Sequence, residues 1–378
     1  MVARPSDALL LAASAKAGGE LDSLILDGVL QTFDDSAGLV APWSLCSCPG
    51  LSERAVQAVV EANGSLRYIS TLSKSSQALD LDTMECFHHM CTLPQLATLR
   101  TDKSCDLSDA PALLRNTPPY GALRLRNLHV SGERTEDASS LVLLLASHAS
   151  LKGFGMNTAA LSAAEFEALL DAALDLRLEA LYLDDITAEL SALSLVQLLN
   201  GGTLKHLFLS FPPHDVASPA FIGALRGCTL VSFGIGGFSL GLEDCLTLLA
   251  ALVRHPTILE LGFYFNPPGG HRKALGNALA ALLAADSLRE LTFHKWDLGD
   301  AGMRPVLAAL KGCTALAELD CWDINITAGF ARRVLLPSVQ ANKSLRALTL
   351  LINGLGMQEL MQAETLVKAR AAVSATSL

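Results

Sequence analysis

The feature that most constrains this chain is a short apolar pattern that recurs along most of its length. Each copy holds an apolar residue, two variable residues, an apolar residue, one variable residue and an apolar residue, as in LRELTF from Leu288. The regular copies follow one another at steps of 26 to 30 residues and begin at Leu125, Leu151, Leu178, Leu204, Leu230, Ile258, Leu288, Leu316 and Leu345. Repetition at such a period indicates a solenoid rather than a set of unrelated elements.

Each of these hexads predicts a short β-strand. Its fourth and sixth residues are separated by one residue, so their side chains point to the same side of a strand. One strand cannot bury that side alone, but stacked copies form a parallel sheet that the intervening helices cover. Helix-like segments do lie between the hexads, and several end at Gly-Cys or His-Pro pairs that fit helix termination. The predicted helices are 164–174, 218–226, 242–253, 271–284 and 303–311.

The pattern weakens toward the N-terminus but continues there. Weaker copies begin at Leu96, Leu66, Val40 and Leu21. We therefore expect one domain over residues 1–378, because no linker or low-complexity segment interrupts the repeats. Residues 1–65 are expected to form an N-terminal cap with irregular repeats. Repeats follow at 66–350, and those before residue 125 are degenerate. Residues 351–378 are expected to be a C-terminal capping segment with a helix at 357–373.

The pattern resembles the leucine-rich repeats of the ribonuclease-inhibitor-like class. This resemblance spans residues 21–350 and implies a right-handed α/β solenoid, a horseshoe with a parallel β-sheet on its concave face and helices on its convex face. The class usually has asparagine at the ninth position of each repeat, where the side chain satisfies backbone groups of the loop. Here that position holds Asn266 and Asn353, but in other repeats it is apolar, as at Ile186, Phe238, Trp296 and Ile324. Loop geometry and curvature therefore depart from the resemblance.

The composition limits the classes of partner. Hydrophobic residues make up 51% of the chain, yet the longest apolar runs are much shorter than the ~20 residues of a membrane-spanning helix. Repeated core positions explain the hydrophobicity instead. The net charge of −10 argues against nucleic acid and anionic membranes as partners. We expect a monomer in the cytoplasm.

The cysteines and histidines suggest a metal site at one place. The nine cysteines have no paired spacing, which favours buried thiols in a reducing compartment over a disulfide framework. The exception is the segment CFHHMC, where Cys86, His88, His89 and Cys91 could bind zinc. The alternative is a helix between two repeats with Phe87 in the core. We favour the helix because the ligand set is incomplete, and we expect no metal and no cofactor.

The N-terminal segment also has two interpretations. Its apolar run at 8–13 and the Ala13-Ser14-Ala15 triplet suggest an export signal, but the run is short and Asp7 precedes it. A helix that begins at Ser6 or Asp7 and ends at the glycine pair 18–19 accounts for the same residues. We favour the capped helix.

No motif of a known active site occurs in the sequence. A phosphate-binding glycine loop, a nucleophile elbow and the HExxH motif are all absent from the sequence. The glycines at 234, 236 and 237 could admit a ligand close to the backbone, or they could relieve crowding near Phe238, which we favour. We therefore predict that the protein is not an enzyme.

The variable positions of the hexads are the best candidates for function, because they point away from the core. At the third position, Glu260, Glu290 and Glu318 stack on adjacent strands about 5 Å apart. Aromatic and charged residues gather at the fifth position and just after the strands, and such mixtures are typical of protein-binding patches. The candidate partner-binding residues are Tyr182, Asp184, His206, Phe208, Phe211, Glu260, Tyr264, Phe265, Glu290, His294, Glu318, Asp320 and Trp322.

Two alternatives to this binding face stay open. Phe265 and Trp322 could turn inward and fill the loops that lack asparagine. The glutamates could be a solvated surface that pairs with Arg289, Lys295 or Arg346. Trp296 is expected to fill the asparagine site rather than to touch a partner.

These observations favour a protein-interaction scaffold that binds a partner protein with a basic surface through its concave face. The alternative is a secreted bacterial effector or ubiquitin-ligase adaptor that acts on host proteins, because similar Ala/Leu-rich repeats occur in effectors such as the GALA-type adaptors. In that case the protein would work inside a host cell. A third class, a repeat enzyme or GTPase-activating protein, needs a catalytic Arg or Asn on a loop, and no residue stands out for that role.

Overall fold

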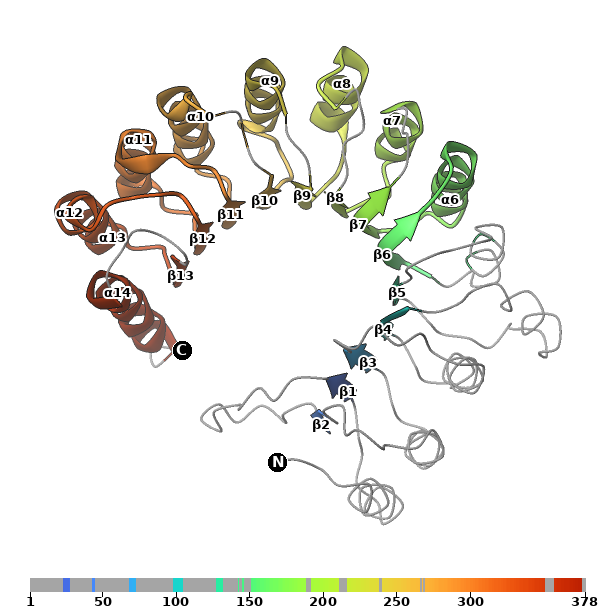
Figure 1. Ribbon diagram of the computed structural model, residues 1–378, viewed down its shortest axis with the longest axis horizontal. Helices are drawn as coiled ribbons and strands as arrows, with labels where there is room; N and C mark the ends of the chain where they lie inside the picture. The colour runs from blue at the N-terminus through green and yellow to red at the C-terminus, as the bar shows by residue number, and fades with distance from the viewer. Residues whose placement is uncertain are drawn as a thin grey trace, which may run out of the picture. The chain divides into compact units, whose positions relative to one another are not determined.

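The computed structural model describes residues 151–187, 192–210, 216–237, 240–265, 267, 269–350 and 357–375, together with residues 142 and 145 and five short strands before them. The chain divides into two compact units, Met1–Ala188 and Glu189–Leu378 (Figure 1). Each unit is described by itself, and the expectation of one continuous domain stays a prediction. The Cys86–Cys91 cluster, the N-terminal segment and Phe211 lie outside the described residues.

The first unit contains a parallel sheet in the order β7-β6-β5-β4-β3-β1-β2. The connection from β6 to β7 is a full helix, α6 (Ala163–Asp175). Strand β1 lies between β3 and β2, so the strand order departs from chain order at this end of the sheet. The strands are β1 (Ser23–Asp27), β2 (Trp43–Ser44), β3 (Tyr68–Leu72), β4 (Thr98–Ser104), β5 (Asn127–Ser131), β6 (Gly153–Ala160) and β7 (Ala180–Thr187).

The second unit alternates strands and helices from one end to the other. Its strands pair in parallel in the order β13-β12-β11-β10-β9-β8, and within this unit they line the inner side of an arc while the helices form its outer side (Figure 1). The strands are β8 (His206–Ser210), β9 (Ser232–Gly236), β10 (Glu260–Tyr264), β11 (Glu290–His294), β12 (Glu318–Trp322) and β13 (Ala347–Thr349). The predicted α/β solenoid of parallel strands is confirmed.

The helices of the second unit follow the predicted positions closely. The predicted segments 218–226, 242–253 and 271–284 correspond to α8, α9 and α10, whereas α11 begins four residues before its predicted start at 303. The helices are α7 (Ala192–Asn200), α8 (Pro219–Gly227), α9 (Leu242–Leu252), α10 (Arg272–Ala284), α11 (Gly299–Gly312), α12 (Ala328–Phe330), the π-helical turn η1 (Ala331–Leu335), α13 (Leu336–Ala341) and α14 (Met357–Ala375).

Local sequence signals explain where several helices begin. Ser162 accepts a hydrogen bond from the backbone N–H of Glu165, while the Glu165 carboxylate accepts one from the Ser162 backbone N–H at 2.7 Å, which forms a capping box for α6. Ser218 caps α8 through its side-chain oxygen, which accepts from the Phe221 backbone N–H at 3.3 Å, with Pro219 at the first helical position. These caps satisfy backbone donors that have no partner inside the helix.

The hexad positions form the core. In the eight hexads from Leu151 to Leu345, the residues at the first, fourth and sixth positions are all buried. The helices complete the core with side chains such as Phe221, Leu248, Leu279 and Val306, which are also buried. Each buried leucine or phenylalanine contributes about 1.5–3 kcal/mol relative to exposure, so this periodic pattern is the main driving force for the fold.

The predicted C-terminal helix at 357–373 is observed as α14, which contacts β13 and α13. Its residues Ala363 and Val367 are buried. The Nη2 atom of Arg370 donates hydrogen bonds to the carbonyl oxygens of Val339 and Gln340, at 2.7 and 3.1 Å. The helix therefore packs on the last repeat through both apolar and polar contacts.

Candidate binding face

The parallel register of the second unit aligns the variable residues of neighbouring hexads in rows. Glu260 pairs with Glu290, and Glu290 pairs with Glu318, so the three glutamates form one row across β10, β11 and β12. Neighbouring strands lie about 4.8 Å apart, which sets the spacing of the row. Two positions further along the strands, a second row contains Gly234, Gly262, Thr292 and Asp320.

The glutamate row has no cation of its own. Among the described residues of the second unit, no ion pair involves Glu260, Glu290 or Glu318. The proposed pairing with Arg346 does not occur in the structure, where the Arg346 Nη1 atom donates to the Lys343 carbonyl oxygen at 2.9 Å. Partial burial raises the pKa of Glu290 above its ordinary value, and the charges of Glu260 and Glu318 raise it further. The row is therefore a concentration of uncompensated negative charge.

A row of aromatic rings runs beside the glutamates. The rings of Phe208 and Tyr264 meet edge to face with centroids 5.5 Å apart, and the Tyr264 ring meets the His294 ring at 4.9 Å. His294 then stacks on Trp322 with centroids 4.6 Å apart. Tyr264 keeps 38% of its surface exposed, although large apolar side chains are normally covered. These four rings, which come from β8, β10, β11 and β12, form a continuous strip that we call the aromatic strip.

Two glycines leave space for two of these rings next to the sheet. A Cβ atom at Gly234 would come within 2.6 Å of the Phe208 ring, and a Cβ atom at Gly262 would come within 2.6 Å of the Tyr264 ring. Gly237 has a φ of +79°, and its N–H donates to the Tyr264 carbonyl oxygen at 3.3 Å. The glycines at 234 and 262 therefore make room for rings of the aromatic strip, while Phe238 lies outside the described residues, so the expected crowding near it stays a prediction.

Tyr264 joins the aromatic strip to the acidic row. Its side chain hydrogen-bonds with the side chain of Thr292, and burial raises the pKa of the Tyr264 phenol, with smaller contributions from the charges of Asp320 and Glu290. The phenol therefore lies within the electrostatic field of the carboxylates. We call the surface formed by both rows the acidic–aromatic face, and it consists of Phe208, Glu260, Tyr264, Glu290, His294, Glu318, Asp320 and Trp322.

Several polar atoms of this face lack a hydrogen-bond partner. The His294 Nε2 atom lies 3.5 Å from the Asp320 Oδ2 atom, an ion-pair distance that does not satisfy hydrogen-bond geometry. The Asp320 Oδ1 and Trp322 Nε1 atoms are covered and have no partner in the structure. Buried polar groups of this kind are normally satisfied, and a bound molecule can pair with these two atoms only after the partly exposed Asp320 and Trp322 side chains rotate.

Phe265 does not belong to the face, which corrects its place among the candidate residues. It is only 2% exposed and packs against Trp296, with ring centroids 5.4 Å apart. This is the inward orientation that the sequence left open. Trp322 does not share it, because its side chain is only partly buried and stacks on His294.

The other candidate residues lie elsewhere. His206 is half-buried on β8, in the row that continues from Ser232 to Glu260. Tyr182 and Asp184 are on β7 in the first unit, where Tyr182 is 42% exposed. The acidic–aromatic face is defined by residues of the second unit, so it does not include these two residues.

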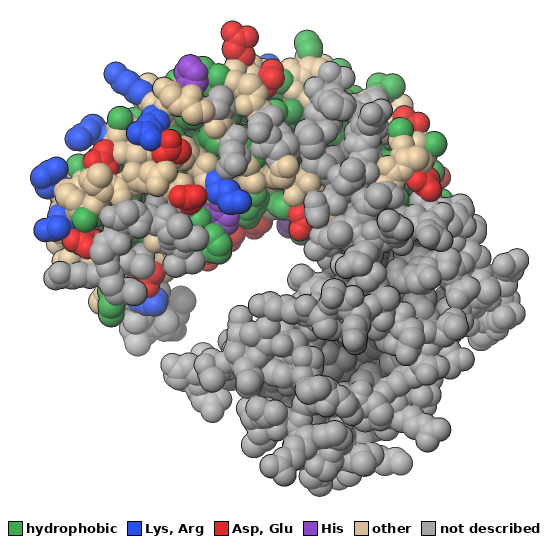
Figure 2. Space-filling model, in the orientation of Figure 1, with side chains coloured by type: hydrophobic (Ala, Val, Ile, Leu, Met, Phe, Trp, Pro, Cys, Tyr) green, Lys and Arg blue, Asp and Glu red, His purple; other side chains and the backbone are tan. Residues whose placement is uncertain are grey.

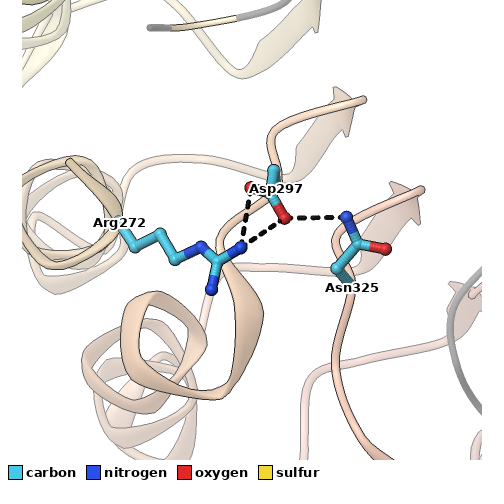
Figure 3. Close-up of polar contacts among 3 residues, drawn as sticks. All are labelled: Arg272, Asp297 and Asn325. Carbon is cyan, nitrogen blue, oxygen red and sulfur yellow. Dashed lines mark hydrogen bonds and ion pairs between the residues drawn. The ribbon is translucent and has the colours of Figure 1, made fainter. Parts of the chain in front are cut away.

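The loops after the strands are held without an asparagine ladder. Trp296 and Ile324 fill the ladder position and are buried, as expected for Trp296. The next residues, Asp297 and Asn325, adopt positive φ values of 34° and 56°, and their side chains bond across the repeat boundary. The Asp297 Oδ1 atom accepts a hydrogen bond from the Asn325 Nδ2 atom at 2.7 Å. The Arg272 Nη2 atom donates to both carboxylate oxygens of Asp297, at 2.8 Å to Oδ1 and 2.7 Å to Oδ2 (Figure 3).

A second set of bonds joins the repeats where each helix ends and the next strand begins. His255 accepts from the Ile258 N–H at its Nδ1 atom and contacts the Leu225 carbonyl oxygen with Nε2 at 2.8 Å. Asn342 bonds the Leu310 and Cys313 carbonyl oxygens, each at 2.8 Å. Neither residue was among the candidates from the sequence. The feature that could have identified them is their position, because each lies three residues before the start of a hexad.

The same bonds argue against a nucleophile at Cys228. Its sulfur lies 3.8 Å from the His255 Nε2 atom, a spacing that could suggest a Cys–His pair. The thiol donates to the Leu225 carbonyl oxygen instead, and burial raises its pKa. A reactive cysteine needs a lowered pKa, so this pair is structural. Within the described ranges, no group of three or more His, Cys, Asp or Glu residues could hold a metal ion.

None of the helices that the structure describes combines the length and apolar character needed to cross a membrane.

Comparisons with known proteins give a likeness in fold. No family model matches the sequence, and no curated protein matches it. Among solved structures, a chain of the yeast Rad7–Elc1 complex is 15% identical, with a TM-score of 0.57 over 92% of this chain and 83% of that chain. A chain of the TLR13–ssRNA13 complex is 14% identical, with a TM-score of 0.36 over 82% of this chain and 52% of that chain. At such identities, only the first likeness supports the fold, and neither transfers a function.

Proposed function

We propose that this protein is a protein-interaction scaffold that binds a partner protein through the acidic–aromatic face of its second unit. The observation that carries the proposal is the strip of contacting rings from Phe208 to Trp322 beside three glutamates without internal cations. Partly exposed Tyr and Trp residues with adjacent charge are the usual centres of protein interfaces. One solved structure of similar fold is itself that of a protein complex, Rad7 with Elc1.

The charge distribution of the second unit favours this face over the helical side for a basic partner. Lys and Arg side chains gather along the outer rim over α10, α11 and α12 (Figure 2). Lys273 and Arg304 are exposed on α10 and α11. A basic partner would be repelled by that rim and attracted to the glutamate row.

The test compares the partners of two variants. The protein and its Tyr264→Ala, Trp322→Ala double variant are used to capture proteins from cells of the source organism, and each captured protein is then titrated as a purified component. We expect at least one to lose about tenfold or more in affinity with the double variant, as hot-spot aromatics do. The control is Met361→Ala, because Met361 is 59% exposed on α14, away from the face. Equal binding by all three proteins would overturn the proposal.

The effector or ubiquitin-ligase adaptor role stays an alternative prediction from the sequence, since no feature of the described residues favours it. Identification of the captured partner would test it directly.

A further inference from the structure

We infer that the partner segment seated on the acidic–aromatic face carries an arginine whose guanidinium lies between the glutamate row and the exposed rings. This inference rests on the proposed function and specifies the chemistry of the occupant.

The acidic–aromatic face has an excess of negative charge that a positively charged occupant would complement. Glu290 has a glutamate on each side in the row, and Asp320 lies on the neighbouring strand in the second row. The nearest positively ionisable group of the face is His294, which contacts Asp320 rather than the glutamates. Opposite charge on the occupant is therefore the strongest single source of complementarity.

The rings distinguish arginine from lysine. A guanidinium is planar and stacks on aromatic faces, while its fork of donors matches carboxylates in a bidentate geometry. Aromatic rings and a carboxylate come together here, because the Tyr264 ring meets the His294 ring at 4.9 Å and the His294 Nε2 atom lies 3.5 Å from the Asp320 Oδ2 atom. A lysine ammonium has three donors but neither a planar fork nor a face that stacks on a ring, and it keeps more of its hydration.

The unsatisfied atoms add a polar requirement. Asp320 Oδ1 can accept a hydrogen bond and Trp322 Nε1 can donate one; neither atom has a partner in the structure, and a rotation of these partly exposed side chains brings each atom to the surface. A peptide segment offers both kinds of group next to its side chains, since every residue except proline has a backbone N–H and C=O. An isolated inorganic cation would leave the Trp322 donor unpaired and the aromatic strip uncovered.

The experiment uses the full chain and a defined probe, a phage-displayed library of linear dodecapeptides. Peptides selected on the wild-type protein are synthesised and titrated against four proteins: wild type, the Glu290→Gln, Glu318→Gln double variant, Trp322→Ala, and Glu243→Gln. The last is a matched control because Glu243 is an exposed acidic residue on α9, outside the face. Circular dichroism and thermal unfolding establish that each variant is folded.

We expect the selected peptides to contain arginine and to lose about tenfold or more in affinity on both face variants, with little change on Glu243→Gln. Replacing the arginine by lysine should also weaken binding severalfold. Peptides that depend on Trp322 but contain no arginine, or bind equally with lysine, would overturn this inference and leave the proposed function standing. Peptides that are insensitive to every face variant would overturn both.

Discussion

Asp286 illustrates how single polar residues hold neighbouring repeats together. Its Oδ1 atom accepts hydrogen bonds from the backbone N–H groups of Thr314 and Ala315, at 2.7 and 2.9 Å, although the residue itself is exposed. These bonds, with a further one from the Thr314 hydroxyl, hold the pKa of the Asp286 carboxyl well below its ordinary value. Since Asp286 lies 28 residues before Thr314, the bonds join one repeat to the next.

The lowered pKa makes a pH-dependent prediction for Asp286→Ala. A carboxylate with a lowered folded pKa stabilises the fold fully above its unfolded pKa of about 3.9 and less as the pH falls further. We expect the variant to lose about 1 kcal/mol near neutral pH, measured by urea unfolding, and the loss to shrink near pH ~2.5. Alanine at this positive-φ position adds a pH-independent cost, so the change of the loss with pH, rather than its size, reports the carboxylate. A loss that is unchanged with pH would contradict the assignment.

The pKa of Glu290 is shifted in the opposite direction to that of Asp286. Its pKa is raised by burial and by Glu260 and Glu318, so its charge is unfavourable in the folded state and the cost appears as the pH rises through the folded pKa. We expect Glu290→Gln to stabilise the protein by about 0.5 kcal/mol near neutral pH and to lose this advantage in acid. Glu243→Gln on α9 should show no comparable gain. If Glu290→Gln were neutral or destabilising at neutral pH, the glutamate row would not carry the repulsion described here.

At the scale of elements, the approach of α10 to α11 depends on glycine. A Cβ atom at Gly276 would overlap the Gly302 carbonyl oxygen, and a Cβ atom at Gly302 would come within 2.6 Å of the Arg272 carbonyl oxygen. Both glycines lie inside helices, where alanine would otherwise be preferred. The two helices are therefore closer than alanine permits, which the periodic pattern of leucines does not reveal.

Gly276→Ala tests this contact against a matched glycine in another helix. We expect it to destabilise the protein by about 2 kcal/mol or more, because backbone must move to admit the methyl group. Gly223→Ala in α8 should instead stabilise by up to about 1 kcal/mol, since no atom lies within 4 Å of its Cβ position. Thermal unfolding of both variants measures the difference. Similar effects of the two substitutions would argue against the close helix contact.

At the scale of the whole molecule, a solenoid depends on contacts between neighbouring repeats, so its last repeat needs a cover. Helix α14 contacts β13, and its Glu359 carboxylate pairs with Arg332 at 2.9 Å while Glu359 is 7% exposed. The helix therefore protects apolar residues of the last repeat, and its loss would leave them open to aggregation.

Comparing Val367→Asp with Met361→Asp tests whether α14 protects the last repeat, or whether any added charge on this helix has the same effect. Val367 is 1% exposed and Met361 is 59% exposed. We expect Val367→Asp to lower the stability by about 3 kcal/mol or more and to increase light scattering on heating, because it buries an unpaired charge. Met361→Asp should be nearly neutral. Equal behaviour would mean that α14 does not stabilise the last repeat.

The sequence alone determined the repeat, its strands, most helix positions and the buried hexad residues, because burial of apolar side chains at a fixed spacing is a local property. It also identified Tyr264, Glu260, Glu290 and Glu318 as neighbours, since parallel register follows from the same spacing. Only the tertiary structure decided that Phe265 turns inward while Trp322 stacks on His294, because ring orientation depends on packing between repeats. The residues that join repeats, such as His255, Asp286 and Asn342, were also visible only in three dimensions, because these partners lie 28 to 32 residues away in the chain.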